Sequence, residues 1–263
     1  MTKDNIKPTN LTIVTAAHCP ELEQIQTDMA GISWPEFMLH DPVSRYFTEL
    51  FEYLPQYQYA ITHNESGEVL AVGNCVPIHF AGALDELPDT GWDWAIEKGI
   101  KDFEANRAHN CLCALQIMIP PDSRGRGLSS HMVLAMMEIA RQNRLDTLIA
   151  PVRPNRKAEF PETPMEEYVR RLDDDGLPFD PWMRVHARLG AQVIKVCEQS
   201  MTIPGTVGEW ESWTGRRFKK SGRYVIPGAL VPIEVICEDD SGRYIEPNVW
   251  MAHSNLLEGR QTG

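Results

Sequence analysis

The segment of this chain with the clearest chemical potential is the run Arg124-Gly125-Arg126-Gly127-Leu128-Ser129. It lies between an apolar stretch at 111–119, which predicts a central strand, and residues 128–141, whose apolar side chains recur at helical spacing. Backbone N–H groups at the start of a helix have no partner, and the helix dipole is positive there. A strand, a glycine turn and a helix in this order therefore predict a phosphate or pyrophosphate site, with two arginines beside the anion.

Two common phosphate motifs do not fit this turn. A P-loop needs Lys followed by Ser or Thr after its last glycine, and Leu128 follows Gly127 here. The dinucleotide fingerprint has three glycines at fixed offsets, and the third is missing. Taken by itself, Arg-Gly-Arg-Gly is also compatible with an ordinary surface loop.

The segment from Ile117 to Ser129 resembles motif A of the GNAT superfamily of acyl-CoA N-acyltransferases. That motif has Arg or Gln, two residues, Gly, one residue, and then Gly or Ala. Arg124 and Gly127 match it, and Ser129 is a departure that keeps the last position small. Further along, Asn155 is similar to the family's asparagine near the pantetheine, and Arg188-Leu189-Gly190-Ala191 is similar to its helix-ending Lys-Leu-Gly-Phe.

The resemblance covers residues 11–204 by the order of elements, although the stretches 78–111 and 155–185 are longer than is usual in the family. Within the family the chain resembles a bacterial subgroup of uncharacterised members. The resemblance implies an α/β (α+β) fold with a mixed, mostly antiparallel sheet flanked by helices, whose strands splay apart near the motif. Residues 1–204 would form this domain, and residues 205–263, rich in Gly, Pro and short apolar runs, would form a small β-rich extension packed on it.

The same resemblance implies where acetyl-CoA, or another acyl-CoA, would bind. The pantetheine would pair with the strand backbone, the pyrophosphate would lie on the N–H groups of the turn, and a backbone donor near Ile119 would stabilise the oxyanion. The cofactor residues would be Ile117, Met118, Ile119, Arg124, Gly125, Arg126, Gly127, Leu128, Ser129, Ser130 and Asn155.

A general acid is expected near the departing sulfur. In many members a tyrosine precedes the helix-ending turn, and His186 takes its place when Arg188-Leu189-Gly190-Ala191 is aligned on that turn. A protonated imidazole could donate a proton near neutral pH. The alternatives are that His186 only packs against the sheet, and that Tyr168 supplies the proton.

Candidate residues for the acceptor site gather in the longer stretches, where loops could shape a pocket. Glu36 could act as a base, but a solvated carboxylate is the more frequent role of such a residue. The tryptophans and aspartates are equally compatible with core residues and helix caps. The candidates are Trp34, Glu36, His40, Asp41, Trp92, Asp93, Trp94, Asp180, Trp182 and Arg184.

The composition disfavours several classes of binding partner. The formal net charge is −12 and no basic stripe is present, which disfavours nucleic acid and anionic membranes. Residues 1–12 are polar, unlike a signal peptide, and the six scattered cysteines are typical of reduced thiols, so a cytoplasmic location is expected. Cys111 and Cys113 lack further ligands at metal-binding spacing and are interpreted as core residues, so no metal is expected.

These observations favour an N-acetyltransferase that acts on a primary amine of a small molecule or peptide. Two alternatives belong to other classes. One is a GNAT-like module that binds acyl-CoA without turnover, as a sensor or scaffold. The other is an ATP-dependent enzyme, which the missing Lys and Mg²⁺-binding hydroxyl disfavour.

Overall fold

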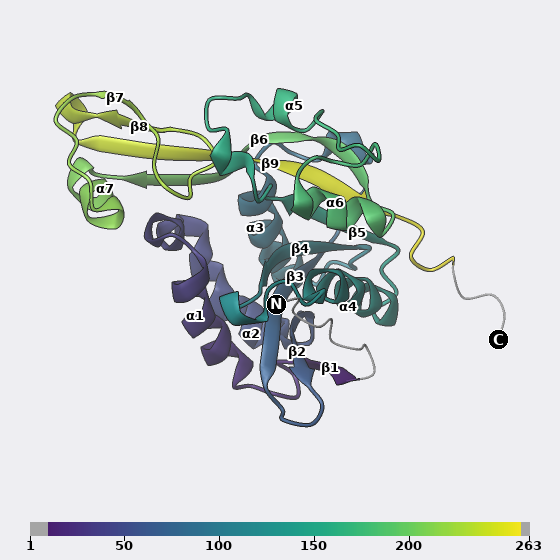
Figure 1. The fold of residues 1–263 in the computed structure, drawn as a ribbon. Helices are drawn as coiled ribbons and strands as arrows, with labels where there is room; N and C mark the ends of the chain where they lie inside the picture. Colours follow the sequence, from purple (N-terminus) through teal and green to yellow (C-terminus); the bar gives the residue numbers. More distant parts are fainter. Residues whose placement is uncertain (1–9, 259–263) are drawn as a thin grey trace.

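The computed structural model describes residues 10–258, and the strands in that range form one sheet (Figure 1). The order along the sheet is β1-β2-β3-β4-β5-β9-β8-β7, and β6 pairs with the other edge of β9. The paired strands are antiparallel except β4 and β5, so the expected mixed, mostly antiparallel sheet is confirmed. The strands are β1 Leu11–Thr15, β2 Gln58–His63, β3 Val69–Ile78, β4 Cys111–Met118, β5 Thr147–Val152, β6 Gln192–Gly205, β7 Gly222–Tyr224, β8 Ile233–Ile236 and β9 Ser241–His253.

Helices flank both faces of the sheet. Successive side chains of a strand point to opposite faces, so two neighbours in β2 locate the helices. Ala60 packs with Leu22 of α1, whereas the hydroxyl of Tyr59 donates to the Met132 carbonyl of α4 over 2.7 Å. α1 and α4 therefore cover opposite faces. The helices are α1 Leu22–Ser33, α2 Phe47–Tyr53, α3 Gly91–Glu104, α4 Leu128–Gln142, α5 Met165–Tyr168, α6 Pro181–Arg188 and α7 Val207–Thr214.

A β-bulge in β4 marks the point where this strand leaves its parallel neighbour. Two successive residues of β3, Asn74 and Cys75, pair with Gln116 and Ala114, so Leu115 is the extra residue of the bulge. The pairing of β4 with β5 extends over the first three residues of β4, before the bulge. Beyond that point the strands diverge, and this is the splay that the resemblance implies.

β6 is one continuous strand, and its register against β9 shifts between Cys197 and Met201. The bulge in that interval carries polar residues. α5 is a single helical turn, and Leu172 beyond it pairs with Pro178 in an isolated bridge.

β9 is an inner strand of the sheet. Its residues 249–253 pair with β5 on one edge and with β6 on the other, and its first residues pair with β8. In Figure 1, β6 and β9 run on past the other strands to the region of β7, β8 and α7. Trp210 and Trp250, both fully buried, share one apolar core with residues of β4 and α4. The proposed boundary between residues 204 and 205 falls at the end of β6, and the division into two parts stays a prediction.

A chain that ends after Pro204 should be insoluble. It would lack β9, so β5 and β6 would each present an unpaired edge and the core would lose Trp210 and Trp250. Soluble yield, size-exclusion profile and circular dichroism would be compared with a chain that ends after Glu258 and keeps β9. A soluble, active chain of residues 1–204 would show that the extension is dispensable.

Candidate active site

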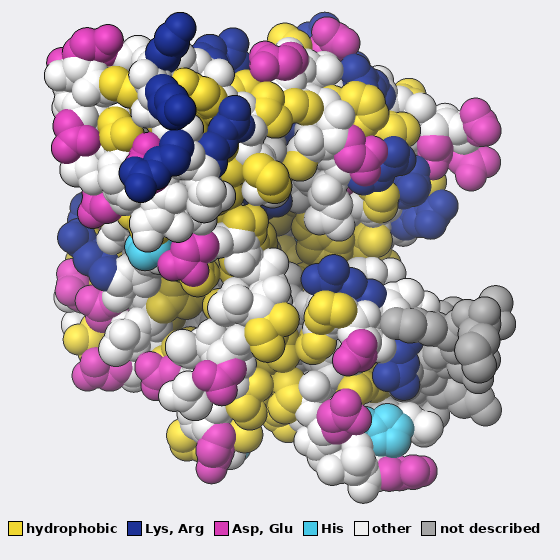
Figure 2. All heavy atoms as spheres, turned by 60° about the vertical axis from the view of Figure 1, so that its left-hand side comes forward, with side chains coloured by type: hydrophobic (Ala, Val, Ile, Leu, Met, Phe, Trp, Pro, Cys, Tyr) yellow, Lys and Arg dark blue, Asp and Glu magenta, His cyan; other side chains and the backbone are white. Residues whose placement is uncertain are grey.

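A pocket of about 1060 Å³ occupies the gap between β4 and β5. Residues 114–119 line it from β4, and residues 150–152 line it from β5. Figure 2 shows the surface hollowed between two parts of the molecule, with hydrophobic side chains in the hollow. Backbone N–H and C=O groups of diverging strands need partners, and a ligand in the gap can supply them.

The glycine turn forms one end of this pocket. Gly125 and Gly127 have φ angles of +76° and +78°, in the left-handed region that favours glycine. Gly127 is the N-cap residue of α4 and has no side chain that could accept from the first-turn N–H groups. The start of α4 is therefore free of a side-chain cap, and this arrangement can hold a phosphate.

Most of the predicted cofactor residues meet at the pocket. Arg124 Nε donates to the carbonyl of Ile119 over 3.1 Å, which ties the turn to the end of β4. Arg126 and Ser130 belong to the same turn and helix but are not among the lining residues. The predicted residues that line the pocket are Ile117, Met118, Ile119, Arg124, Gly125, Gly127, Leu128, Ser129 and Asn155. Their roles toward the cofactor stay predictions.

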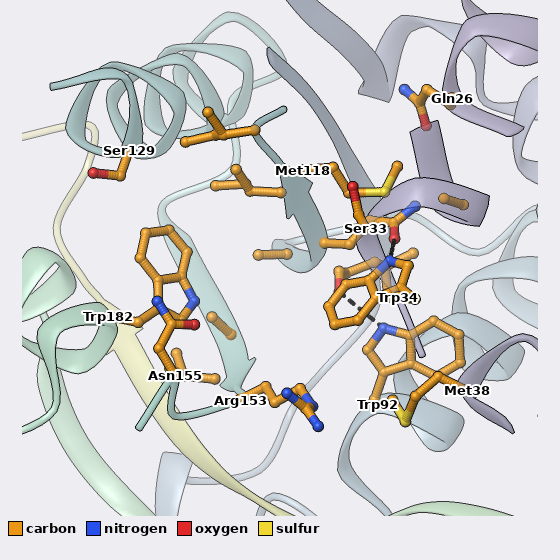
Figure 3. Close-up of a pocket in the computed structure, with 18 of the residues that line it drawn as sticks. Gln26, Ser33, Trp34, Met38, Trp92, Met118, Ser129, Arg153, Asn155 and Trp182 are labelled. Carbon is orange, nitrogen blue, oxygen red and sulfur yellow. Dashed lines mark hydrogen bonds between the residues drawn. The ribbon is translucent and has the colours of Figure 1, made fainter. Parts of the chain in front are cut away.

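Two of the predicted acceptor tryptophans support the bulged part of β4. Trp92 Nε1 donates to the carbonyl of Leu115 over 2.8 Å, and Trp34 Nε1 donates to Oε1 of Gln116 over 3.1 Å. Both tryptophans line the pocket, and Figure 3 shows them together with Met38 on one side of it. Each indole therefore packs in the core and also presents a surface to the pocket.

Trp182 and His186 lie on α6. Trp182 lines the pocket on the side opposite Trp34, next to Asn155 (Figure 3). His186 also borders the pocket, but it is only 1% exposed, packs edge-on against Trp182, and shares a 3.2 Å hydrogen bond between its Nδ1 and Nε2 of His253. Burial, with a smaller contribution from His253, lowers the pKa of His186 to about 3.

His186 is therefore neutral at pH 7. The imidazolium form, on which its predicted role as general acid depends, is not populated there. The alternative acid, Tyr168, is buried outside the pocket lining, and its hydroxyl donates to Asp180 over 2.9 Å. Burial and this neighbouring carboxylate raise the pKa of Tyr168 above its ordinary value.

Glu36 and His40 lie apart from the pocket. They form an ion pair of 2.9 Å one helical turn apart, with side chains 59% and 38% exposed. The His40 ring stacks on Trp213 at 4.4 Å between centroids. Neither residue lines the pocket, so the structure does not bring the predicted base or His40 to the gap between β4 and β5.

Trp94, Asp180 and Arg184 do not line the pocket, and each has a structural partner. Trp94 packs edge-on against Phe80 and Trp250. Asp180 caps α6 by accepting from the Trp182 and Met183 N–H groups. Arg184 forms a 2.9 Å ion pair with Asp173. For Asp180 the cap interpretation is the one that the structure supports.

Asp41 and Asp93 form a buried carboxyl pair. Asp41 caps the 3₁₀ turn Pro42–Tyr46 through the Val43 N–H, and Asp93 accepts from the Thr202 N–H of β6 over 3.0 Å. Burial raises the pKa of both carboxyls, and the neighbouring Asp41 raises the pKa of Asp93 further.

Sequence reasoning missed Arg153 and Glu246. Arg153 follows β5 and lines the pocket, and its Nε lies 2.9 Å from both carboxylate oxygens of the fully buried Glu246 in β9. The residues are 93 positions apart. No local spacing in the sequence joins them, and a long-range strand pairing brings them together.

Among residues 10–258 no group of His, Cys, Asp and Glu could hold a metal ion. Cys111 and Cys113 are free and buried in the core, as expected. Within the same range no helix is long and apolar enough to span a bilayer.

Comparison with known proteins relates this geometry to a family. In fold, the chain is similar to the loading GNATL domain of CurA from Lyngbya majuscula, with a TM-score of 0.57 and 14% identity over 94% of this chain and 98% of that one. It is also similar to the GNAT-like decarboxylase GphF in complex with isobutyryl-CoA, with a TM-score of 0.51 and 13% identity over 92% and 98%. No protein-family model matches the chain.

A curated protein gives the deciding comparison. The arginine N-acetyltransferase avaD of Aspergillus versicolor is 33% identical in an alignment of 277 positions, which covers 94% of this chain and 94% of that protein. This chain belongs to the GNAT family. It is an acyl-CoA-dependent N-acetyltransferase, and the pocket between β4 and β5 is its candidate active site.

Removing both arginines of the turn should weaken binding of acetyl-CoA to the acetyltransferase. Charge-assisted contacts of this kind contribute about 1–3 kcal/mol, so Arg124→Ala with Arg126→Ala should raise the Kd roughly tenfold to a hundredfold. Isothermal titration calorimetry with acetyl-CoA would measure the Kd. Arg170→Ala, whose side chain is 79% exposed, is the control. Unchanged affinity in the double variant would remove the turn from the cofactor site.

The acetyltransferase should lose stability as the pH falls through the titration range of His186. Its pKa is lower in the folded chain than the ordinary value of 6.5, so the unfolded chain takes up the proton first. From pH 7 to pH 5, wild type should lose about 2 kcal/mol more stability than His186→Asn, at about 1.4 kcal/mol per pH unit below 6.5. Urea unfolding at both pH values would measure this. Parallel losses in the two proteins would contradict the buried neutral state.

Proposed function

We propose that this enzyme transfers the acetyl group of acetyl-CoA to a nitrogen of an arginine-type acceptor. The observation that carries the proposal is the 33% identity, over 94% of the chain, with an arginine N-acetyltransferase. The pocket supports it, because its lining continues from the glycine turn to Trp34 and Trp92. Glu23, in the first turn of α1, adds a carboxylate to that lining and could pair with a cationic acceptor.

The chemistry needs few groups. The acceptor nitrogen attacks the thioester carbonyl and gives up a proton, the C–N bond forms, the C–S bond breaks, and the leaving thiolate takes up a proton. The chain would hold the pyrophosphate at the start of α4 and the pantetheine along Ile117, Met118 and Ile119. It would also offer a backbone donor near Ile119 to the developing oxyanion. Holding nitrogen and thioester in register then accounts for much of the rate.

The proposal includes a cytoplasmic location, a bacterial origin and a small-molecule acceptor. A cytoplasmic location is supported by the composition, including six cysteines that are free in the part of the chain the structure describes. The bacterial attribution is supported by sequence motifs alone, and the curated relative is fungal. A small-molecule acceptor fits the size of the pocket better than a folded protein.

An acceptor panel tests the proposed function. The enzyme with acetyl-CoA should release free thiol most rapidly with L-arginine or an arginine derivative, and more slowly with L-lysine and tryptamine. Mass spectrometry of the product should show one added acetyl group. Tight binding of acetyl-CoA without thiol release from any amine would instead favour the sensor or scaffold alternative.

A further inference from the structure

Arg153 crosses the pocket from one wall to the other. It follows the last residue of β5, and its guanidinium carbon lies 5.8 Å from the ring centroid of Trp34, which ends α1 on the far side. Its side chain is 21% exposed. In Figure 3 it lies between the wall that carries Trp182 and Asn155 and the wall that carries Trp34 and Trp92. The guanidinium therefore lies between the end of the pocket proposed for the cofactor, at the glycine turn and Asn155, and the end proposed for the acceptor, at Trp34 and Trp92. These two ends are called the cofactor half and the acceptor half.

Its orientation is fixed by hydrogen-bond partners from two distant segments. Nε lies 2.9 Å from each oxygen of Glu246, and Nη2 donates to the carbonyl of Gly228 over 2.6 Å. Gly228 has a φ of +86°, and a Cβ there would lie 2.6 Å from Pro35, beside Trp34. Glycine is thus required where the loop approaches α1. An arginine held in this way loses little side-chain entropy when a ligand binds to it.

Glu246 holds Arg153 and is itself saturated. Besides the Arg153 contacts it accepts from the hydroxyl of Tyr244 over 2.7 Å and from Nδ2 of Asn248 over 3.1 Å. Its side chain is fully buried, which makes it a fixed counter-ion and a poor candidate for the base. Arg153, in contrast, has five N–H donors, and its contacts with Glu246, Gly228 and Tyr244 account for three of them among the described residues.

We infer that Arg153 binds a carbonyl or carboxylate oxygen of the acceptor, and that it makes the enzyme select amino-acid-derived acceptors over plain amines. The inference rests on the proposed function. Planar N–H donors at fixed positions suit an oxygen with lone pairs in one plane, such as that of a carboxylate or an amide. Arg153 and Glu246 together are formally neutral, so a neutral amide oxygen and a carboxylate are both acceptable.

Three substrates that share the arginine side chain distinguish binding of a carboxylate from binding of a neutral carbonyl oxygen. L-arginine has the carboxylate, L-argininamide has a neutral carbonyl in its place, and agmatine lacks the group. Wild type should show kcat/KM for arginine or argininamide at least about tenfold above that for agmatine, because a charge-assisted hydrogen bond is lost. Preference for arginine alone would identify a carboxylate, and equal use of arginine and argininamide would identify a carbonyl oxygen.

The test variant is Arg153→Gln with Glu246→Gln. Removing the arginine alone would leave a buried carboxylate unpaired, whereas the double change keeps an acceptor for Tyr244 and Asn248. In this variant the KM for arginine should rise until the kcat/KM values of the three substrates differ by less than about threefold. The matched control is Arg217→Gln with Glu211→Gln, a 2.6 Å pair outside this pocket, which should keep the wild-type ratios.

The outcomes separate the two proposals. Equal use of the three substrates by wild type, or an unchanged preference in the double variant, overturns the role of Arg153 and leaves the proposed function standing. If agmatine and arginine turnover fall together in the variant, Arg153 is a structural residue and the inference also fails. If wild type acetylates none of the three, the proposed function fails and the inference fails with it.

Discussion

The bulge at Leu115 is the constraint on which the rest of the site depends. A parallel pair of strands would normally bury its ladder of hydrogen bonds, and here β4 and β5 stop pairing before the bulge. The extra residue leaves a carbonyl without a strand partner, and the Trp92 indole donates to it. A buried carbonyl with no donor would cost about 1–3 kcal/mol. Trp92 therefore stabilises the bulge, and the bulge opens the pocket.

A line of amide side chains runs from the pocket wall into the sheet. Trp34 donates to Gln116, Gln116 Nε2 donates to Asn74 over 2.8 Å, and Asn74 Nδ2 donates to Gln58 over 2.8 Å. Gln58 then donates to two backbone carbonyls, of which one is that of Cys75, on β3 opposite the bulge. Each amide has one orientation that satisfies its neighbours, so the chain of bonds fixes the indole of Trp34. The wall of the acceptor half is thus set by residues inside the sheet.

Local signals identified the elements at one end of the pocket. The strand, the turn and α4 are contiguous in sequence, and positive φ angles at Gly125 and Gly127 are what glycine permits. The order of strands up to β5 follows from the resemblance. The helix α7 could also have been predicted, because Thr206 and Glu209 form a capping box that is visible in the sequence.

Local sequence signals did not predict the parts of the structure that depend on long-range strand pairing. β9 is an inner strand although it lies near the end of the chain, and its partner β5 precedes it by about a hundred residues. Nothing within a short window distinguishes an inner strand from a hairpin in a small extension. For this reason Arg153 and Glu246 were missed. Glu36, named as a possible base, lies on the surface, which is the more frequent position of such a carboxylate. Burial likewise alters His186 in a way that its residue type does not indicate.

The two halves of the pocket therefore have different origins in the chain. The end of the pocket that is proposed for the cofactor comes from a single strand, turn and helix, and its geometry depends on backbone conformation more than on side chains. The acceptor half is assembled from α1, α3, β9 and the loop at Gly228, which meet through Trp34, Trp92 and Arg153. The contacts that hold these side chains do not pass through the turn, although Trp92 also stabilises the bulge that opens the pocket. The conformation of the turn and the shape of the opposite wall are therefore set by different parts of the chain.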